Sequence, residues 1–179
     1  MLRYVLPLIA SIGLSTIGCA QSPSDSMGWR ATESMIARDF PGTPTISTDS
    51  LAAWLADDTR TPPLLLDARE PNEYAVSHLA GARHLPPDTP ADSLRSLLSG
   101  VPAGRPVVVY CSVGYRSAKV TQRLRDAGFS DVQNLSGSIF RWANEGRPVV
   151  RGDSTVREVH PFDATWGRLL DAELRAKRR

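Results

Sequence analysis

The chain has 179 residues, of which 41% are hydrophobic and 22% are charged, and its formal net charge is +2. This length and apolar content are typical of one globular domain with short appendages. Acidic and basic residues are mixed, without a basic face or stripe, so we expect no nucleic-acid partner.

The first residues show the pattern of an export signal. A basic residue, Arg3, precedes an almost uncharged apolar stretch over residues 4–17, which is too short to be assigned as a membrane span. The stretch leads into Gly18-Cys19-Ala20, which resembles the bacterial lipoprotein box, where the cysteine becomes the acylated N-terminus. We therefore predict a signal peptide over residues 1–18 and lipidation at Cys19. A plain secretory signal and an uncleaved anchor are the alternatives.

This N-terminus predicts a protein exported to the bacterial envelope, facing the periplasm and held at a membrane through its N-terminal lipid. The pattern does not distinguish the inner from the outer membrane. After Cys19, residues 20–28 are small and polar and predict a tether, and residues 29–40 predict a short helix that packs against the domain. We assign residues 19–43 to the lipidated N-terminus, tether and short helix.

Strand and helix patterns alternate over residues 44–150. Short apolar runs bounded by turn residues predict strands at residue 46, over residues 64–67, after residue 81, and over residues 107–110 and 132–135. Helical spacing and capping residues predict helices after residue 48, from residue 70, and over residues 92–98, 117–127 and 138–145. This alternation predicts an α/β domain with a mainly parallel central sheet and helices on both faces.

Residues 151–179 form a C-terminal extension that ends in a predicted amphipathic helix. One apolar stripe of this helix comprises Trp166, Leu169, Leu170 and Leu174. Acidic residues interrupt the polar face, so docking of the stripe on the domain is favoured over a membrane or partner surface.

Cys111 is the candidate for the chemistry of this chain. It follows the apolar strand over residues 107–110 and precedes a helical pattern that begins at Ser117. In open α/β sheets, ligands bind at this end of a strand. Backbone N–H groups of such a loop and the following helix N-terminus attract anions, and Arg116 adds a permanent charge. We therefore predict a thiol with a lowered pKa that reacts as the thiolate.

The alternative for Cys111 is an inert cysteine buried in the core. Gly114 and Arg116 argue against it, since a core position needs neither a permissive backbone nor a guanidinium group. If Cys19 is lipidated, Cys111 is the only free thiol and no intramolecular disulfide can form. We predict that the substrate is bound by Ser112, Val113, Gly114, Tyr115, Arg116 and Ser117.

Several motifs in their order along the chain resemble those of single-domain rhodanese-like proteins, the sulfurtransferase family. They are Leu66-Asp67-Ala68-Arg69, Glu73-Tyr74, residues 77–82, residues 111–117, Leu135-Ser136-Gly137, Trp142 and Gly146-Arg147-Pro148-Val149. The resemblance runs from Ile46 to Val150, with Ser77 and Ser136 in place of glycines. Residues 137–146, 159–162 and 166–167 are similar to a subgroup of bacterial rhodanese-like proteins that carries this C-terminal extension.

The resemblance implies a rhodanese-like fold and sulfur transfer through a persulfide. The thiolate of Cys111 would take the outer sulfur of thiosulfate or a related donor and pass it to cyanide or a thiol. Arg116 would position the anionic donor, and no metal or organic cofactor is implied. The family positions of Asp67, Arg69 and Glu73 brace the fold, and those of His78 and His84 support a turn and a strand.

Other functions remain open alternatives. A phosphatase or arsenate reductase on the same fold has five residues between the cysteine and the arginine, whereas four separate Cys111 from Arg116. The shorter loop suits a sulfur atom better than a tetrahedral phosphate. A non-turnover persulfide carrier, or a sulfur-binding or protein-binding module at the membrane, is the alternative outside enzymes.

Overall fold

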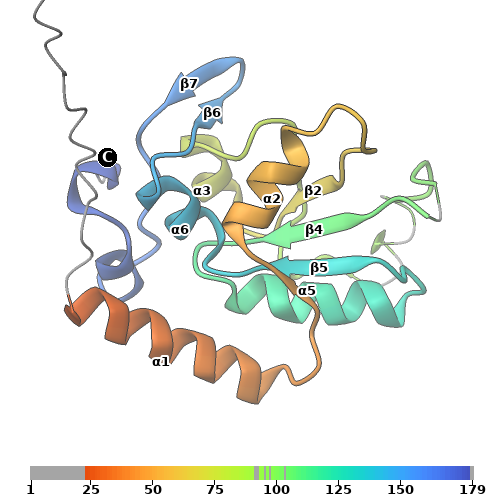
Figure 1. The fold of residues 1–179 in the computed structure, drawn as a ribbon, viewed down its shortest axis with the longest axis horizontal. Helices are drawn as coiled ribbons and strands as arrows, with labels where there is room; N and C mark the ends of the chain where they lie inside the picture. The colour runs from red at the N-terminus through yellow and green to blue at the C-terminus, as the bar shows by residue number, and fades with distance from the viewer. Residues whose placement is uncertain (1–22, 91–92, 95, 97, 103, 178–179) are drawn as a thin grey trace, which may run out of the picture.

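The structure is a computed structural model that describes residues 23–90, 93–94, 96, 98–102 and 104–177. Its elements are drawn in Figure 1. In chain order they are α1 (Pro23–Asp39), β1 (Thr45–Ile46), α2 (Thr48–Leu55), β2 (Leu64–Asp67), α3 (Pro71–Val76), β3 (Arg83–His84), β4 (Val107–Tyr110), α5 (Tyr115–Asp126), β5 (Val132–Leu135), α6 (Ser138–Asn144), β6 (Val149–Arg151), β7 (Ser154–Val156), and the 3-10 helices η1 (Trp166–Leu169) and η2 (Ala172–Leu174). Residues 1–22, with the predicted signal peptide and Cys19, lie outside this description, as does part of the helix predicted at 92–98.

The centre of the fold is a parallel sheet with the strand order β1-β5-β4-β2-β3. Strand β4 lies in the middle, and its Val109 pairs with Leu66 of β2 and Asn134 of β5. All four residues of β4 are buried, as their β-branched and aromatic composition predicts for a strand covered on both faces. The predicted α/β class, mainly parallel sheet and strand positions are confirmed.

Alternate residues of the strands enter two separate cores. Leu65 and Val108 join a core with α2, α6 and the C-terminal segment, whereas Leu66 and Val109 join a core with α5. In Figure 1, α2 and α6 lie above the strands and α5 lies below them. Each fully buried aliphatic side chain contributes about 1.5–3 kcal/mol of transfer free energy, so both faces stabilise the sheet.

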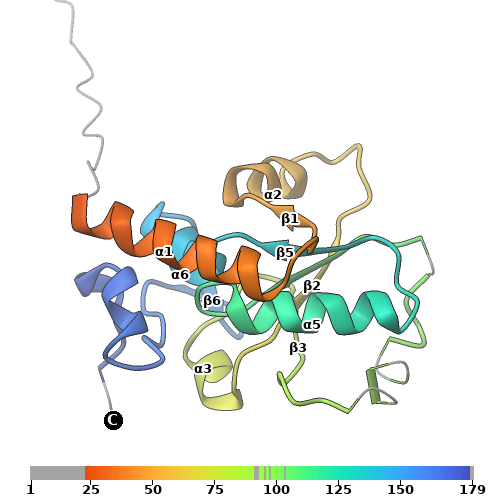
Figure 2. The ribbon, with the colours of Figure 1, turned by 90° about the horizontal axis from the view of Figure 1, so that it is seen from below.

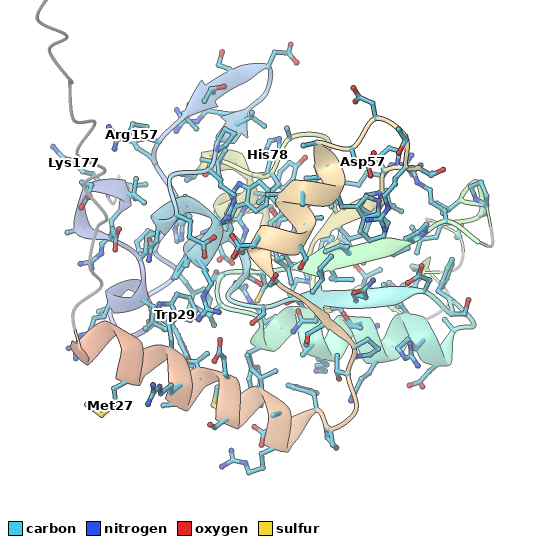
Figure 3. The ribbon with its side chains drawn as sticks, viewed as in Figure 1. Met27, Trp29, Asp57, His78, Arg157 and Lys177 are labelled. Carbon is cyan, nitrogen blue, oxygen red and sulfur yellow. The ribbon has the colours of Figure 1, made fainter. Side chains whose placement is uncertain are left out.

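Helix α1 begins at Pro23, so the prediction of a tether over residues 23–28 is wrong. Proline suits a first helical turn because its missing N–H has no partner to lose there. Trp29 is only 4% exposed and packs in the core, and Figure 3 shows it pointing toward the domain while Met27 points away. The helix also contacts η1 and α5. These tertiary contacts stabilise a helix that small polar residues alone do not predict.

The C-terminal extension is not a continuous amphipathic helix, contrary to the prediction. Leu170 is extended between the two short 3-10 turns. The side chain of Asn144 in α6 donates a hydrogen bond to the carbonyl of Leu169 at 2.8 Å and accepts one from the N–H of Asp171 at 3.0 Å. These tertiary bonds engage the backbone at the break between the turns.

The predicted docking of the extension on the domain is confirmed. Leu170 and Leu174 are buried in the core above the sheet, together with Val159. The predicted boundary at residue 150 lies inside β6, which pairs with β7 and, through Val150, with His78. The extension is therefore part of the same packed unit as the sheet. Among the described residues, no helix is long and apolar enough to cross a membrane.

Candidate active site

Cys111 lies directly after β4 in a tight loop that ends where α5 begins at Tyr115. Its side chain is 1% exposed, and its Sγ accepts a hydrogen bond from the N–H of Gly114 at 3.2 Å. Helix α5 places its positive N-terminal end behind this loop. The sulfur therefore faces backbone N–H donors, as the sequence predicts for an anion-binding loop.

The turn at Gly114 requires glycine. Its φ is +112°, a left-handed conformation that other residues rarely adopt, and an added Cβ would lie 3.3 Å from the Cδ1 of Ile36. The carbonyl of Gly114 accepts a hydrogen bond from the Nδ2 of Asn134 at 3.0 Å. The neighbouring strand thus holds the peptide that turns the chain from the cysteine into α5.

Helix α6 holds the loop from its other side. Ser138 Oγ accepts the N–H of Cys111 at 3.1 Å and donates to the carbonyl of Leu135 at 3.0 Å. The N–H groups of Ile139 and Phe140 donate to the carbonyls of Cys111 and Ser112 at 3.2 and 3.1 Å. The first turn of α6 therefore engages the loop carbonyls. The sequence predicts this helix, but no pattern within it assigns Ser138 to the site.

Arg116 is paired with Glu73 of α3. Its Nη1 and Nη2 donate to the two carboxylate oxygens at 2.6 and 2.8 Å, and Nη2 also donates to Ser112 Oγ at 3.0 Å. The Ser112 hydroxyl in turn donates to Glu73 Oε1 at 2.9 Å. Burial by itself would raise the pKa of Glu73, but the hydrogen bonds and the charge of Arg116 lower it by more. The net shift of the pKa is downward, so the carboxylate is charged.

Glu73 therefore has two structural roles. It forms the capping box of α3 with Glu70, and it anchors the guanidinium of the cysteine loop. The bracing role implied by the family resemblance is confirmed, and the link to Arg116 is an addition that only the tertiary structure provides. The charge of Arg116 is already balanced by Glu73. That Arg116 positions an anionic donor therefore stays a prediction.

The other charged and aromatic residues of the family motifs form a support behind the loop. Arg69 and Asp67 make a fully buried ion pair with 2.6 Å between Nη2 and Oδ2. His84 Nε2 lies 2.7 Å from the carbonyl of Arg69, and His78 Nδ1 lies 3.1 Å from that of Tyr74. Both rings stack on Tyr74. These contacts confirm the structural roles predicted for the two histidines.

The surroundings of Cys111 favour its thiolate. Burial raises the pKa of the thiol, but the charge of Arg116 and hydrogen bonding from Ser117 and Gly114 lower it, and the net shift is downward. The buried Ser117 hydroxyl has no other hydrogen-bond partner among the described residues. A lowered pKa increases the fraction of Cys111 that is present as the reactive thiolate.

A cavity of about 270 Å³ opens onto Cys111. Part of its wall comes from the loop residues that the sequence analysis selected, namely Ser112, Val113, Tyr115 and Arg116. The remaining wall comes from Met35 of α1 and from Phe162 and Trp166 of the C-terminal segment. These three residues are not among the site residues predicted from the sequence, because nothing in their local pattern relates them to residue 111.

Tyr115 is fixed from outside by the end of α1. Its hydroxyl donates to Asp39 Oδ2 at 3.1 Å, and its ring meets Phe40 edge-on with 4.9 Å between centroids.

Within the described part of the chain, no three His, Cys, Asp or Glu side chains gather as a metal site would require. The cysteine loop presents to this cavity a buried thiol whose Sγ accepts a backbone N–H.

Known proteins share this domain. Residues 47–145 match the family described as Rhodanese-like domain. A sulfurtransferase from Allochromatium vinosum is 36% identical over 105 residues, which cover 59% of this chain and 92% of that protein. The probable adenylyltransferase/sulfurtransferase MoeZ from Mycobacterium tuberculosis is 35% identical over 110 residues, 58% of this chain but 26% of that protein. This chain thus matches about a quarter of the length of MoeZ.

A solved structure shows the same fold. The rhodanese-like domain of the Alr3790 protein from Anabaena sp. has a TM-score of 0.51 at 24% identity, covering 63% of this chain and 83% of that chain. The family match includes β2, β4, the Cys111 loop, α5 and α6, which together build the site. Because this match covers more than half of the sequence, the chain belongs to the rhodanese-like domain family, in which its relatives include sulfurtransferases.

Proposed function

We propose that the protein is a sulfurtransferase that moves sulfane sulfur from thiosulfate or a related donor to cyanide or a thiol through a persulfide on Cys111. The observation that carries the proposal is the position of the Cys111 sulfur, 3.2 Å from the N–H of Gly114 at the N-terminal end of α5, with its pKa lowered. This arrangement suits both the attacking thiolate and the persulfide anion that follows it.

The reaction has two balanced steps. The Cys111 thiolate attacks the outer sulfur of thiosulfate, a new sulfur–sulfur bond forms, and the old one breaks with its electron pair leaving on sulfite. Cyanide then attacks the terminal sulfur of the persulfide and leaves as thiocyanate, which restores the thiolate. During the interval the negative persulfide is stabilised by backbone N–H groups of the loop, because donors fixed in advance need no reorganisation.

Intact-mass measurement after incubation with thiosulfate tests this proposal. We expect the wild type to gain the mass of one sulfur atom and to lose it on addition of cyanide, with thiocyanate released over many turnovers. Cys111→Ser should gain nothing. A wild type that gains no sulfur contradicts sulfur transfer. One that loads sulfur but passes it neither to cyanide, as thiocyanate, nor to a small thiol, as its persulfide, indicates a carrier for a specific partner instead.

We also propose that the protein is an exported lipoprotein, held in the bacterial envelope through Cys19. The support is the apolar N-terminal stretch that ends in Gly18-Cys19. When the full chain is expressed in a Gram-negative bacterium with an alkynyl fatty acid, the wild type should carry the label in the membrane fraction. Cys19→Ala should not. An unlabelled wild type in the soluble fraction would contradict the lipid anchor.

A further inference from the structure

Part of the cavity wall beside Cys111 comes from outside the family domain. Met35, Phe162 and Trp166 all lie outside residues 47–145, the range that matches the family. Figures 1 and 2 both show the C-terminal segment lying next to α1, and η1 contacts that helix. Two segments that flank the domain in sequence therefore close over its reactive cysteine. They contribute a thioether and two aromatic rings.

The side chains of the cavity offer no unpaired charge to a ligand. Arg116 is the only charged side chain among the described residues that line it. Both of its terminal nitrogens are bonded to Glu73, and its guanidinium lies 4.6 Å from the ring centroid of Phe162. The cation is therefore neutralised by a carboxylate and partly covered by a ring. A dianion that entered would lose its water shell without gaining an unpaired cation.

Phe162 is held in its position at a conformational cost. Its φ is +62°, which a bulky side chain adopts only when its surroundings stabilise that conformation. Its N–H donates to His160 Nδ1 at 3.0 Å, and an added Cβ on Gly167 would lie 3.0 Å from the Cβ of Pro161. The segment around Phe162 is tightly folded. Residues held in such conformations concentrate at ligand sites.

The volume of the cavity fits a small ring. A closed apolar cavity of about 150 Å³ is enough to bind benzene. The 270 Å³ beside Cys111 therefore has room for an aromatic or branched aliphatic group and for the sulfur that Cys111 attacks.

We infer that the sulfur donor of this protein is an organic compound whose sulfane sulfur is attached to an apolar body, and that Met35, Phe162 and Trp166 select it over thiosulfate. The inference rests on the proposed sulfur transfer and names its donor class. Thiosulfonates and organic persulfides have this chemistry. The apolar body lies against the two rings and the thioether, while the sulfane sulfur meets the Cys111 thiolate.

For a thiosulfonate, the loading step balances without any other reactant. The Cys111 thiolate attacks the terminal sulfur, and a sulfur–sulfur bond forms to the enzyme. The bond from that sulfur to the sulfonyl sulfur breaks, and its electron pair leaves on the organic sulfinate. Two negative charges are present before the step, on thiolate and donor, and two after it, on persulfide and sulfinate.

Benzenethiosulfonate and thiosulfate are a matched pair of probes, because they differ only in a phenyl group in place of one charged oxygen. The rate constant for Cys111 persulfide formation is measured with both donors. Each rate constant is divided by that of the same donor with free cysteine in solution, and the normalised ratio is the value for benzenethiosulfonate over the value for thiosulfate. For the wild type we expect this normalised ratio to favour benzenethiosulfonate by about tenfold or more, as an aromatic body packed against rings contributes.

Phe162→Ala and Met35→Ala should each lower the ratio by about threefold to tenfold, mainly through slower reaction with benzenethiosulfonate. Met27→Ala is the matched control, since Met27 is in the same helix but 69% exposed and points away from the domain (Figure 3). It should leave the ratio unchanged. Thermal unfolding of each variant checks that it is folded. We expect Phe162→Ala to fold, because the Phe162 side chain is 38% exposed.

A normalised wild-type ratio near one, or a ratio that Phe162→Ala and Met35→Ala leave unchanged while both donors load, would overturn the inference and leave sulfur transfer intact. Failure of the wild type to form a persulfide from either donor would instead overturn the proposed function itself.

Discussion

The pair formed by Arg116 and Glu73 bears directly on the pKa of the Cys111 thiol. The guanidinium lowers the pKa of Cys111 through its charge, yet it is held in place by a carboxylate that is itself 1% exposed. Removing one member of such a pair leaves an uncompensated buried charge, which costs about 3–5 kcal/mol. Arg116 thus acts on the pKa of Cys111 and also contributes to the stability of the fold through its buried partner Glu73.

Replacing Arg116 by glutamine should move the pH profile of Cys111. The thiolate is the reactive form, and without the positive charge its pKa rises, so the rate of alkylation by iodoacetamide should reach its plateau at higher pH than in the wild type. The free energy of unfolding should fall by about 3–5 kcal/mol, measured by urea denaturation.

The double variant Glu73→Gln with Arg116→Gln separates these two effects. It leaves no unpaired carboxylate, so most of the lost stability should return, while the alkylation profile stays at higher pH. A profile of Arg116→Gln that coincides with that of the wild type would contradict electrostatic activation by this residue.

At the scale of elements, the cysteine loop is held between two helix N-termini. Helix α5 supplies donors to the sulfur. Helix α6 donates to the loop carbonyls through the N–H groups of Ile139 and Phe140, and its Ser138 hydroxyl accepts the N–H of Cys111. The loop is four residues long between Cys111 and Arg116, and it turns sharply at Gly114. Its geometry therefore depends on one backbone conformation that alanine adopts only with strain.

Gly114→Ala should destabilise the protein by about 1–2 kcal/mol and slow persulfide formation by about 100-fold, because the new Cβ strains the turn and moves the sulfur from its donors. Gly128→Ala is the matched control. Gly128 has a similar φ of +102°, and an added Cβ there meets nothing within 4 Å.

Gly128→Ala should lower the free energy of unfolding by a similar amount to Gly114→Ala and keep the wild-type rate of persulfide formation. Stability is measured by denaturant unfolding and rate by intact mass after timed quenching. If Gly114→Ala retained the wild-type rate, the turn would not be what positions the sulfur.

On the scale of the whole molecule, the flanking segments matter as much as the sheet. Helix α1 and the C-terminal segment after β7, residues 157–177, lie side by side in both views (Figures 1 and 2). Residues 40–156 separate them along the chain. Phe162 reaches Arg116 from one segment, and Met35 reaches the same cavity from the other. The family domain provides the reactive cysteine, and the flanking segments provide the remaining walls of its cavity.

Much of the fold follows from local patterns. The apolar run at β4, the helical spacing of α5 and the placement of Gly114 each involve a few neighbouring residues, and strong local preferences of this kind survive in the tertiary structure. The same patterns correctly predict the parallel sheet and the place of Cys111 at its carboxyl edge. The predicted start of α1 and the continuous C-terminal helix are wrong, because contacts of Trp29 and Asn144 outweigh weak local propensity.

The sequence by itself determined the family, the parallel sheet and the candidate nucleophile of this protein. The motifs of the family and the strand patterns each involve a few neighbouring residues, and the loop from Cys111 to Ser117 is one of them. Only the tertiary structure decided what surrounds that nucleophile. The pairing of Glu73 with Arg116 and the placement of Met35, Phe162 and Trp166 at the cavity depend on residues dozens of positions apart. Contacts at that separation arise when whole elements pack, and no local pattern encodes them.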